Sequence, residues 1–269
     1  MAPFEFTRAA IPMRTSQKNE HYWQQPRVWG PLLLLWGTAL GIWLADLNQP
    51  LFLVLNGGQN EIFWSGMTIL GDTAVALALL LPFCGREPRL ISALLISVIP
   101  GTLLVHGAKA LFDAARPAAV LAADQIQVIG PFLSSHSFPS GHTATAFIAA
   151  GLVLLHFRDS NWFIEGFLVA LLVGFSRVIV GAHWPVDVLV GAGIGWATAA
   201  MSVYWAGRWS PVVTLPVQRV VALILLAGAI YTLLVLDTSY PQAIWLQYLI
   251  AAAVIILAIP GLRCLFQRK

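Results

Sequence analysis

Charged residues are scarce in this sequence of 269 residues. Only 10% of them are charged and 58% are hydrophobic, whereas about a quarter of the residues in soluble domains carry a charge. This shortage excludes a water-soluble chain and indicates a protein embedded in a membrane. The two cysteines, Cys84 and Cys264, are too few for a disulfide framework. Both fall at span ends that the charge pattern assigns to the cytoplasm, so we expect no disulfide.

The hydrophobic residues are gathered into long apolar runs. A helix needs about 20 consecutive apolar residues to cross roughly 30 Å of hydrocarbon, and eight runs reach or approach that length. They extend from Trp29 to Leu47, Ile62 to Cys84, Leu90 to Phe112, Gly141 to Phe157, Trp162 to Gly181, Pro185 to Ala206, Pro216 to Leu236 and Ala243 to Pro260. The pattern predicts an all-α fold, a polytopic transmembrane helical bundle of about eight spans.

Lysine and arginine are distributed unevenly between the two ends of these spans. Residues 1–28 are polar and lack a small-residue cleavage site, so we expect a retained tail rather than a signal peptide. If this tail is cytoplasmic, twelve of the 15 cations lie inside or at inner span ends, as the positive-inside rule requires. These twelve are Arg8, Arg14, Lys18, Arg27, Arg86, Arg89, Arg158, Arg208, Arg219, Arg263, Arg268 and Lys269. Both termini are therefore predicted to be cytoplasmic.

Three cations are left at the outer ends of the spans, and these are Lys109, Arg116 and Arg177. Cations at the wrong end of a span are costly and generally serve a function. The one long outer segment, from Asp113 to about Phe138, joins the third and fourth runs and is a candidate lid. Inside the second run, Asp72 requires a partner or an interfacial position.

Lys109 and Arg116 form the first of three sequence blocks with a chemical pattern. Six residues separate them, and Pro117 follows where the third run ends, so both cations can reach one anion. A planar guanidinium grips phosphate at two points, and an ammonium adds a point charge. The block predicts a phosphoryl-binding site, although interfacial Lys and Arg also extend towards headgroups without binding a ligand.

The second block, Phe138-Pro139-Ser140-Gly141-His142, directly precedes the fourth apolar run. Ser140 can cap that helix, and Gly141 lets an anion approach the free amides at the positive end of the helix dipole. His142 then stands at the edge of an anion site. The alternative interpretation is an ordinary N-cap followed by an incidental histidine.

The third block places Ser176 and Arg177, then His183, then Asp187 on the two sides of the turn between the fifth and sixth runs. Pro185 suits the first turn of the sixth helix. The Asp187 carboxylate can fold back to His183, hold one ring nitrogen protonated and leave the other as a nucleophile. The alternative is a pair that only satisfies two polar groups at the interface.

Together the three blocks resemble the signature of the type 2 phosphatidic acid phosphatase superfamily, which also contains soluble bacterial acid phosphatases and vanadium haloperoxidases. The eight-span arrangement brings all three blocks to the outer face. The resemblance covers the six runs from Trp29 to Ala206 and implies a six-span phosphatase core over residues 29–206. Residues 1–28 are then the cytoplasmic tail. Residues 207–269, two additional spans with a short cytoplasmic tail, have no counterpart in that core.

The resemblance also implies a role for each matched residue. His183 attacks phosphorus to give a phosphohistidine, Asp187 orients it, and His142 protonates the leaving oxygen and then activates water. The phosphoryl oxygens are held by Lys109, Arg116, Ser140, the Gly141 amide and Arg177. No metal-ligand set is evident, and five donors around one anion leave little need for Mg²⁺, so we expect no metal and no cofactor.

The predicted function is a metal-independent lipid phosphatase of the inner (cytoplasmic) membrane, with its active site facing the periplasm. The substrate is a membrane lipid with a terminal phosphate or pyrophosphate, such as undecaprenyl pyrophosphate, phosphatidylglycerophosphate or phosphatidic acid. A lipid phosphotransferase using the same phosphohistidine is an alternative, whereas a haloperoxidase would require vanadate. A non-catalytic anion-binding or transport protein is the alternative from another class, and the presence of both His183 and Asp187 disfavours it. Nothing in the sequence indicates a nucleic-acid partner or an oligomeric state.

Overall fold

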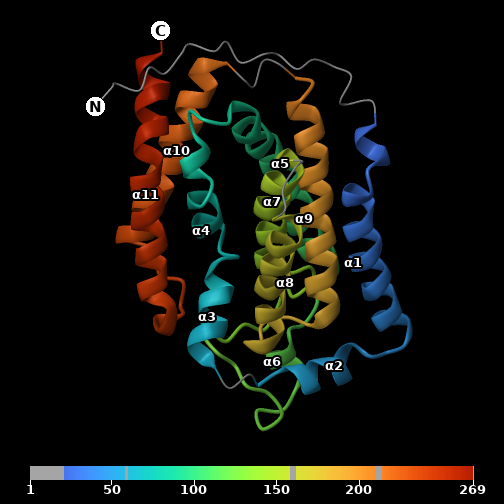
Figure 1. Cartoon of the computed structure of the whole chain (residues 1–269). Helices are drawn as coiled ribbons and strands as arrows, with labels where there is room; N and C mark the ends of the chain where they lie inside the picture. Colours follow the sequence, from blue (N-terminus) through green and yellow to red (C-terminus); the bar gives the residue numbers. More distant parts are fainter. Residues whose placement is uncertain (1–20, 58–59, 158–161, 210–213, 269) are drawn as a thin grey trace.

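Long helices run side by side through the molecule, and turns join them at its two ends (Figure 1). The computed structural model describes residues 21–57, 60–157, 162–209 and 214–268, and within these ranges there is no β-strand. The predicted all-α bundle is confirmed. The long helices are α1 (Pro26–Leu44), α5 (Pro88–Phe112), α7 (Gly141–His156), α8 (Phe163–Ile179), α9 (Pro185–Ala206), α10 (Leu215–Leu234) and α11 (Ile244–Gln267). The shorter ones are η2 (Tyr22–Gln24), α2 (Asn48–Leu55), α3 (Glu61–Ile69), α4 (Thr73–Ala78), η3 (Leu81–Phe83), α6 (Pro117–Val120) and η5 (Pro241–Ala243).

Five helical stretches in the described part of the chain are long and apolar enough to cross a membrane, and a bent pair raises the number to six if it is one span. The five contain α1, α5, α9, α10 and α11, and the bent pair is α3 with α4. Helices α7 and α8 have only 16 and 17 residues, and they lie alongside α9 in Figure 1. A count of about eight spans therefore stays a prediction.

The second apolar run is broken rather than continuous. The chain bends by 63° between α3 and α4, and Asp72 stands at the break. Its carboxylate accepts hydrogen bonds from the amides of Ala74 (2.8 Å) and Val75 (3.3 Å) and so caps α4. The run from Ile62 to Cys84 is therefore not one continuous helix, because this acidic side chain begins a new helix, and its crossing as a single span stays a prediction.

Glycines bring α9 unusually close to α7. A side-chain carbon on Gly191 would lie 2.5 Å from the carbonyl oxygen of Ser140, and one on Gly195 would lie 2.3 Å from that of Ala144. Small residues at a helix interface allow the two backbones to approach. Since α9 also packs against α5 and α1, it fixes the positions of three neighbours, and it holds the first turn of α7 beside its own.

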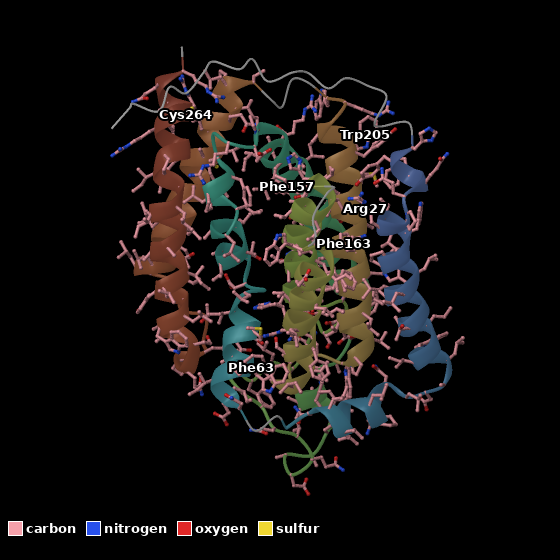
Figure 2. The ribbon with its side chains drawn as sticks, in the orientation of Figure 1. Arg27, Phe63, Phe157, Phe163, Trp205 and Cys264 are labelled. Carbon is pink, nitrogen blue, oxygen red and sulfur yellow. The ribbon has the colours of Figure 1, made fainter. Side chains whose placement is uncertain are left out.

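The described cations separate between the two ends of the bundle. Figure 2 places Arg27 and Cys264 towards one end and Phe63 towards the other. Seven cations lie in turns or helix ends at the Arg27 end, namely Arg27, Arg86, Arg89, Arg208, Arg219, Arg263 and Arg268. Lys109, Arg116 and Arg177 lie towards the opposite end. Arg8, Arg14, Lys18, Arg158 and Lys269 lie outside the described residues. The charge asymmetry that the sequence predicted is therefore present in the described part of the fold.

The last two helices form a hairpin on one side of the bundle (Figure 1). Helices α10 and α11 pack against each other and against α4 and η3. The connection between them, which includes η5, contacts α3. The hairpin therefore reaches the same end of the molecule as Lys109 and Arg177.

Replacing Gly195 with alanine should destabilise the bundle. The added carbon would lie 2.3 Å from the Ala144 carbonyl oxygen and 2.8 Å from Cβ of Phe147, and overpacking of this kind typically costs about 1–3 kcal/mol. The thermal unfolding midpoint of the purified protein in detergent should fall. Gly228→Ala on α10 is the matched control, because nothing lies within 4 Å of its added carbon. A midpoint that falls equally in both variants would contradict the proposed α7–α9 contact.

Candidate active site

The three sequence blocks meet at one end of the bundle. Lys109 lies in the last turn of α5, His142 in the first turn of α7, Arg177 in the last turn of α8 and Asp187 in the first turn of α9. In Figure 1 these helix ends lie towards α6, at the end of the bundle opposite the start of α1. Residues separated by up to 78 positions in the sequence are thus brought to one place.

His183 lies on the turn between α8 and α9, with 2% of its surface exposed. Its Nε2 atom is 3.4 Å from Nη1 of Arg116. Because a guanidinium only donates hydrogen bonds, Nε2 accepts and carries the lone pair. Burial, and then the positive charges of Arg116 and Arg177, lower the pKa of His183 well below its ordinary value. The ring is therefore neutral near pH 7.

Asp187 stands on the other side of the His183 ring. Its Oδ2 atom is 3.6 Å from Nδ1 of His183, slightly beyond a hydrogen bond. The same oxygen accepts from the Ser137 hydroxyl (2.5 Å) and from the Trp184 amide (3.0 Å), so the carboxylate is fixed at the start of α9. The two residues lie side by side as the sequence predicted, but the carboxylate accepts its hydrogen bonds from Ser137 and Trp184 rather than from His183.

Ser137 is a site residue that the sequence analysis missed. Its Oγ atom lies 3.5 Å from Nδ1 of His183 while it donates to Asp187, and it is fully buried. The only signal in the sequence was a hydroxyl residue just ahead of the second block. It completes the polar contacts on the Nδ1 side of the ring.

The outer segment of residues 113–138, which we call the lid, is held by hydrogen bonds from two cations, Arg116 within the lid and Lys109 at the end of α5. Arg116 donates from Nε to the Ser135 carbonyl (2.8 Å) and from Nη1 to the Ala182 carbonyl (2.9 Å). Lys109 donates to the carbonyl of His136. These contacts hold the lid against the His183 turn.

Asn56 anchors the lid at a second point. Its amide group donates to the carbonyls of Gln127 (2.9 Å) and Ile179 (2.9 Å), and its side-chain oxygen accepts from the Gln127 amide (2.8 Å). This side chain therefore joins the middle of the lid to the end of α8.

Ser140 caps α7, which confirms the structural part of the second-block prediction. Its hydroxyl oxygen accepts from the Thr143 amide (3.4 Å) and the Thr143 hydroxyl (2.9 Å). Its own hydroxyl hydrogen remains able to donate. The Ser140 amide donates to the carbonyl of Asp187 (3.0 Å), so the starts of α7 and α9 are joined directly.

Gly141 and His142 follow at the start of α7. A side-chain carbon on Gly141 would lie 3.9 Å from Cε of Lys109, so the glycine backbone faces that lysine. His142 lies within electrostatic reach of Arg177, His183, Arg116 and Lys109. All eight predicted site residues are therefore gathered around one region, and their chemical roles stay predictions.

Arg177 is 2% exposed and has a partner that the sequence analysis missed. Its Nη1 atom donates to the Tyr240 hydroxyl at 2.9 Å, while its Nε atom has no hydrogen-bond partner among the described residues. Tyr240 comes from the connection between α10 and α11, for which the sequence suggested no chemistry. A lone tyrosine 63 positions away gave no signal of this contact.

The arrangement suits a tetrahedral anion carrying several negative charges. Three cationic side chains, a helix N-terminus and a histidine whose Nε2 atom accepts from Arg116 surround one region. In the part of the chain that the structure describes, no group of three or more His, Cys, Asp or Glu is placed to hold a metal ion.

Comparison with known proteins places these residues in a family context. The family model described as the PAP2 superfamily matches residues 89–211. An undecaprenyl-diphosphatase from Sulfolobus acidocaldarius is 33% identical over 149 residues, which are 55% of this chain and 65% of that protein. A lipid A 1-phosphatase from Porphyromonas gingivalis is 42% identical over 74 residues, which are 27% of this chain and 16% of that protein. The chain thus spans less than two thirds of each of these relatives.

A solved structure gives a match that covers nearly all of the related chain. The crystal structure of Aquifex aeolicus LpxE is similar with a TM-score of 0.54 and 32% sequence identity, over 58% of this chain and 94% of that one. The region matched by the family model contains all eight predicted site residues, and Tyr240 lies outside it. The resemblance drawn from the three blocks is confirmed, and this chain belongs to the PAP2 superfamily.

Proposed function

We propose that this protein is a membrane lipid phosphatase that removes a terminal phosphate through a phosphohistidine on His183. The observation that carries the proposal is the arrangement around this one ring. Nε2 lies beside the Arg116 guanidinium, and Nδ1 lies beside Ser137 and Asp187. A neutral imidazole with its lone pair beside a cation is placed to attack an anion that the cation holds.

The proposed reaction has two steps. The Nε2 lone pair forms a bond to phosphorus, and the bond from phosphorus to the leaving oxygen breaks. His142 takes up a proton from solvent once the bound phosphate offsets the cations around it, and it supplies this proton to the leaving oxygen. Asp187 and Ser137 offset the positive charge on the phosphorylated ring. Water next attacks phosphorus, His142 takes its proton, and the bond to Nε2 breaks to release phosphate.

The phosphoryl oxygens are held throughout by groups that are already positioned. Lys109, Arg116 and Arg177 supply charge, and the Ser140 hydroxyl and Gly141 amide donate at the start of α7. Positioning and charge stabilisation supply most of the catalysis in phosphoryl transfer. The reaction as proposed uses no metal ion.

A lipid substrate is favoured by the surface that leads to Lys109. On the same helix, α5, the side chains of Leu103, Leu104, Leu111 and Phe112 are all at least half exposed. This apolar surface can contact acyl or isoprenoid chains while the phosphate reaches the last turn of the helix. The names of the relatives, undecaprenyl-diphosphatase and lipid A 1-phosphatase, support a lipid phosphate or pyrophosphate.

We further propose that the protein lies in the inner membrane with this site facing the periplasm. Seven described cations lie at the opposite end of the bundle, and short segments rich in Lys and Arg stay in the cytoplasm. The substrate phosphate would then be removed in the outer leaflet.

The proposed function is tested by phosphate release in detergent. Wild-type protein given undecaprenyl pyrophosphate, phosphatidylglycerophosphate, phosphatidic acid or lipid A should release inorganic phosphate from at least one, and EDTA should not prevent it. His183→Ala should reduce release at least a thousandfold, because the nucleophile is gone. His106→Ala is the matched control, since this histidine is exposed on α5.

Three results would contradict parts of the proposal. If no lipid yields phosphate, the protein is not the phosphatase proposed here. If phosphate appears only on a second added lipid, the enzyme is a phosphotransferase. If EDTA stops the reaction and Mg²⁺ restores it, the metal-free site is wrong.

The role of His142 predicts a dependence on the leaving group. His142→Ala should slow phosphate monoesters by about a hundredfold or more, but pyrophosphates much less, because a general acid matters most where the departing oxygen is basic. The measurement is kcat/KM for phosphatidic acid and for undecaprenyl pyrophosphate in wild type and variant. Equal losses on the two substrates would remove His142 as the general acid.

The orientation predicts which residues an impermeant reagent can reach. Ala123 is an exposed lid residue and Cys264 is exposed at the other end of the bundle, while Cys84 is buried. In intact spheroplasts, a membrane-impermeant maleimide should label Ala123→Cys and leave Cys264 unlabelled until detergent is added. Labelling in the reverse order would place the active site in the cytoplasm.

A further inference from the structure

We propose that Tyr240 is a positioning residue of the active site, which holds Arg177 in the orientation that receives the phosphoryl group. This inference rests on the proposed function and adds to it a residue from the α10–α11 hairpin, outside the part of the chain that the family model matches. The hairpin is then part of the catalytic structure as well as of the membrane-embedded bundle.

The contact between the two side chains is buried. Arg177 is 2% exposed and Tyr240 is 3% exposed, and Nη1 of the arginine donates to the phenol oxygen at 2.9 Å. A buried guanidinium is costly unless its donors find acceptors. Within the described ranges, this phenol is the one side chain that accepts a hydrogen bond from Arg177.

The remaining donors of Arg177 are left for another acceptor. Its Nε atom is buried and has no partner among the described residues, and an unmet buried donor is destabilising. A phosphoryl oxygen would satisfy this donor. By fixing Nη1, the phenol leaves the Nε edge of the guanidinium for a two-point grip on the phosphoryl group. Arg177 also interacts electrostatically with both His183 and His142, so it lies within the reacting region.

Tyr240 is itself held firmly. Its ring belongs to an apolar cluster with Ile69, Ile129, Val180, Ala182 and Ala243. These residues come from α3, the lid, the turn that follows α8 and η5. The ring is therefore a rigid support rather than a mobile surface group.

The lid also fits closely around this ring. Gly130 has a φ of +88°, and a side-chain carbon there would lie 2.5 Å from Cε1 of Tyr240. The Ile129 amide next to it donates to the Val180 carbonyl at 3.1 Å. Since phenylalanine would keep all of this packing, its main effect is to remove the hydrogen bond to Arg177.

The direct test is Tyr240→Phe in the full-length protein. Loss of the hydroxyl should lower kcat/KM for the best lipid substrate about tenfold and raise the Ki of vanadate by a similar factor. Vanadate is the sensitive probe because it adopts the pentacoordinate geometry of the transition state. The thermal unfolding midpoint should fall by no more than a few degrees, because Arg177 loses one buried acceptor while the packing is kept. Tyr248→Phe on α11 is the matched control, because this tyrosine is 45% exposed and should give wild-type kinetics.

A double-mutant cycle separates a role through Arg177 from an independent one. Arg177→Lys keeps the charge but loses the planar two-point grip, so Tyr240→Phe added to it should cost no more than about twofold further. Tenfold losses that multiply in the double variant would overturn the inference, as would wild-type kinetics and vanadate affinity in Tyr240→Phe. Either result, obtained with active wild-type protein, would leave the proposed function standing. Failure of that function would instead appear as wild-type protein that releases no phosphate.

Discussion

The clustering of Lys109, Arg116 and Arg177 at one end of the bundle is the constraint on which the rest of the site depends. Arg116 and Arg177 are buried, and the buried carboxylate of Asp187 is engaged by Ser137 and Trp184. Such charges are tolerated only when their donors are satisfied. The protein does so with neutral acceptors, which are lid carbonyls for Lys109 and Arg116 and a phenol for Arg177. These neutral acceptors leave the positive charge of the site uncompensated, which supports the proposed phosphate site.

Close packing of α7 on α9 fixes the relative positions of the site residues at the starts of these two helices. Because Gly191 carries no side chain, the backbone of Ser140 approaches α9, and its amide reaches the carbonyl of Asp187. The start of α7 and the Asp187 carboxylate beside His183 are thereby held together. A site built on helix ends in this way is held more precisely than one built on loops alone.

The sequence predicted the parts of this structure that periodicity and local motifs report. Apolar runs gave the helices, cation placement gave the two ends, and the three blocks gave eight residues that the fold brings together. It failed at the second run, where Asp72 caps a new helix inside an apolar stretch. It also missed Ser137 and Tyr240, because each acts through a contact 46 to 63 residues away that leaves no local pattern.

These missed contacts bear on how lipid selectivity can arise. Relatives with different names, an undecaprenyl-diphosphatase and a lipid A 1-phosphatase, are both similar to this one chain, so the similarity by itself does not indicate which lipid this protein would bind. Each of the three cations is oriented by a residue outside its own block. Lys109 and Arg116 contact lid carbonyls, and Arg177 contacts the α10–α11 hairpin. Under the proposed function, the lid and the hairpin are therefore the segments in which differences in lipid specificity should be sought.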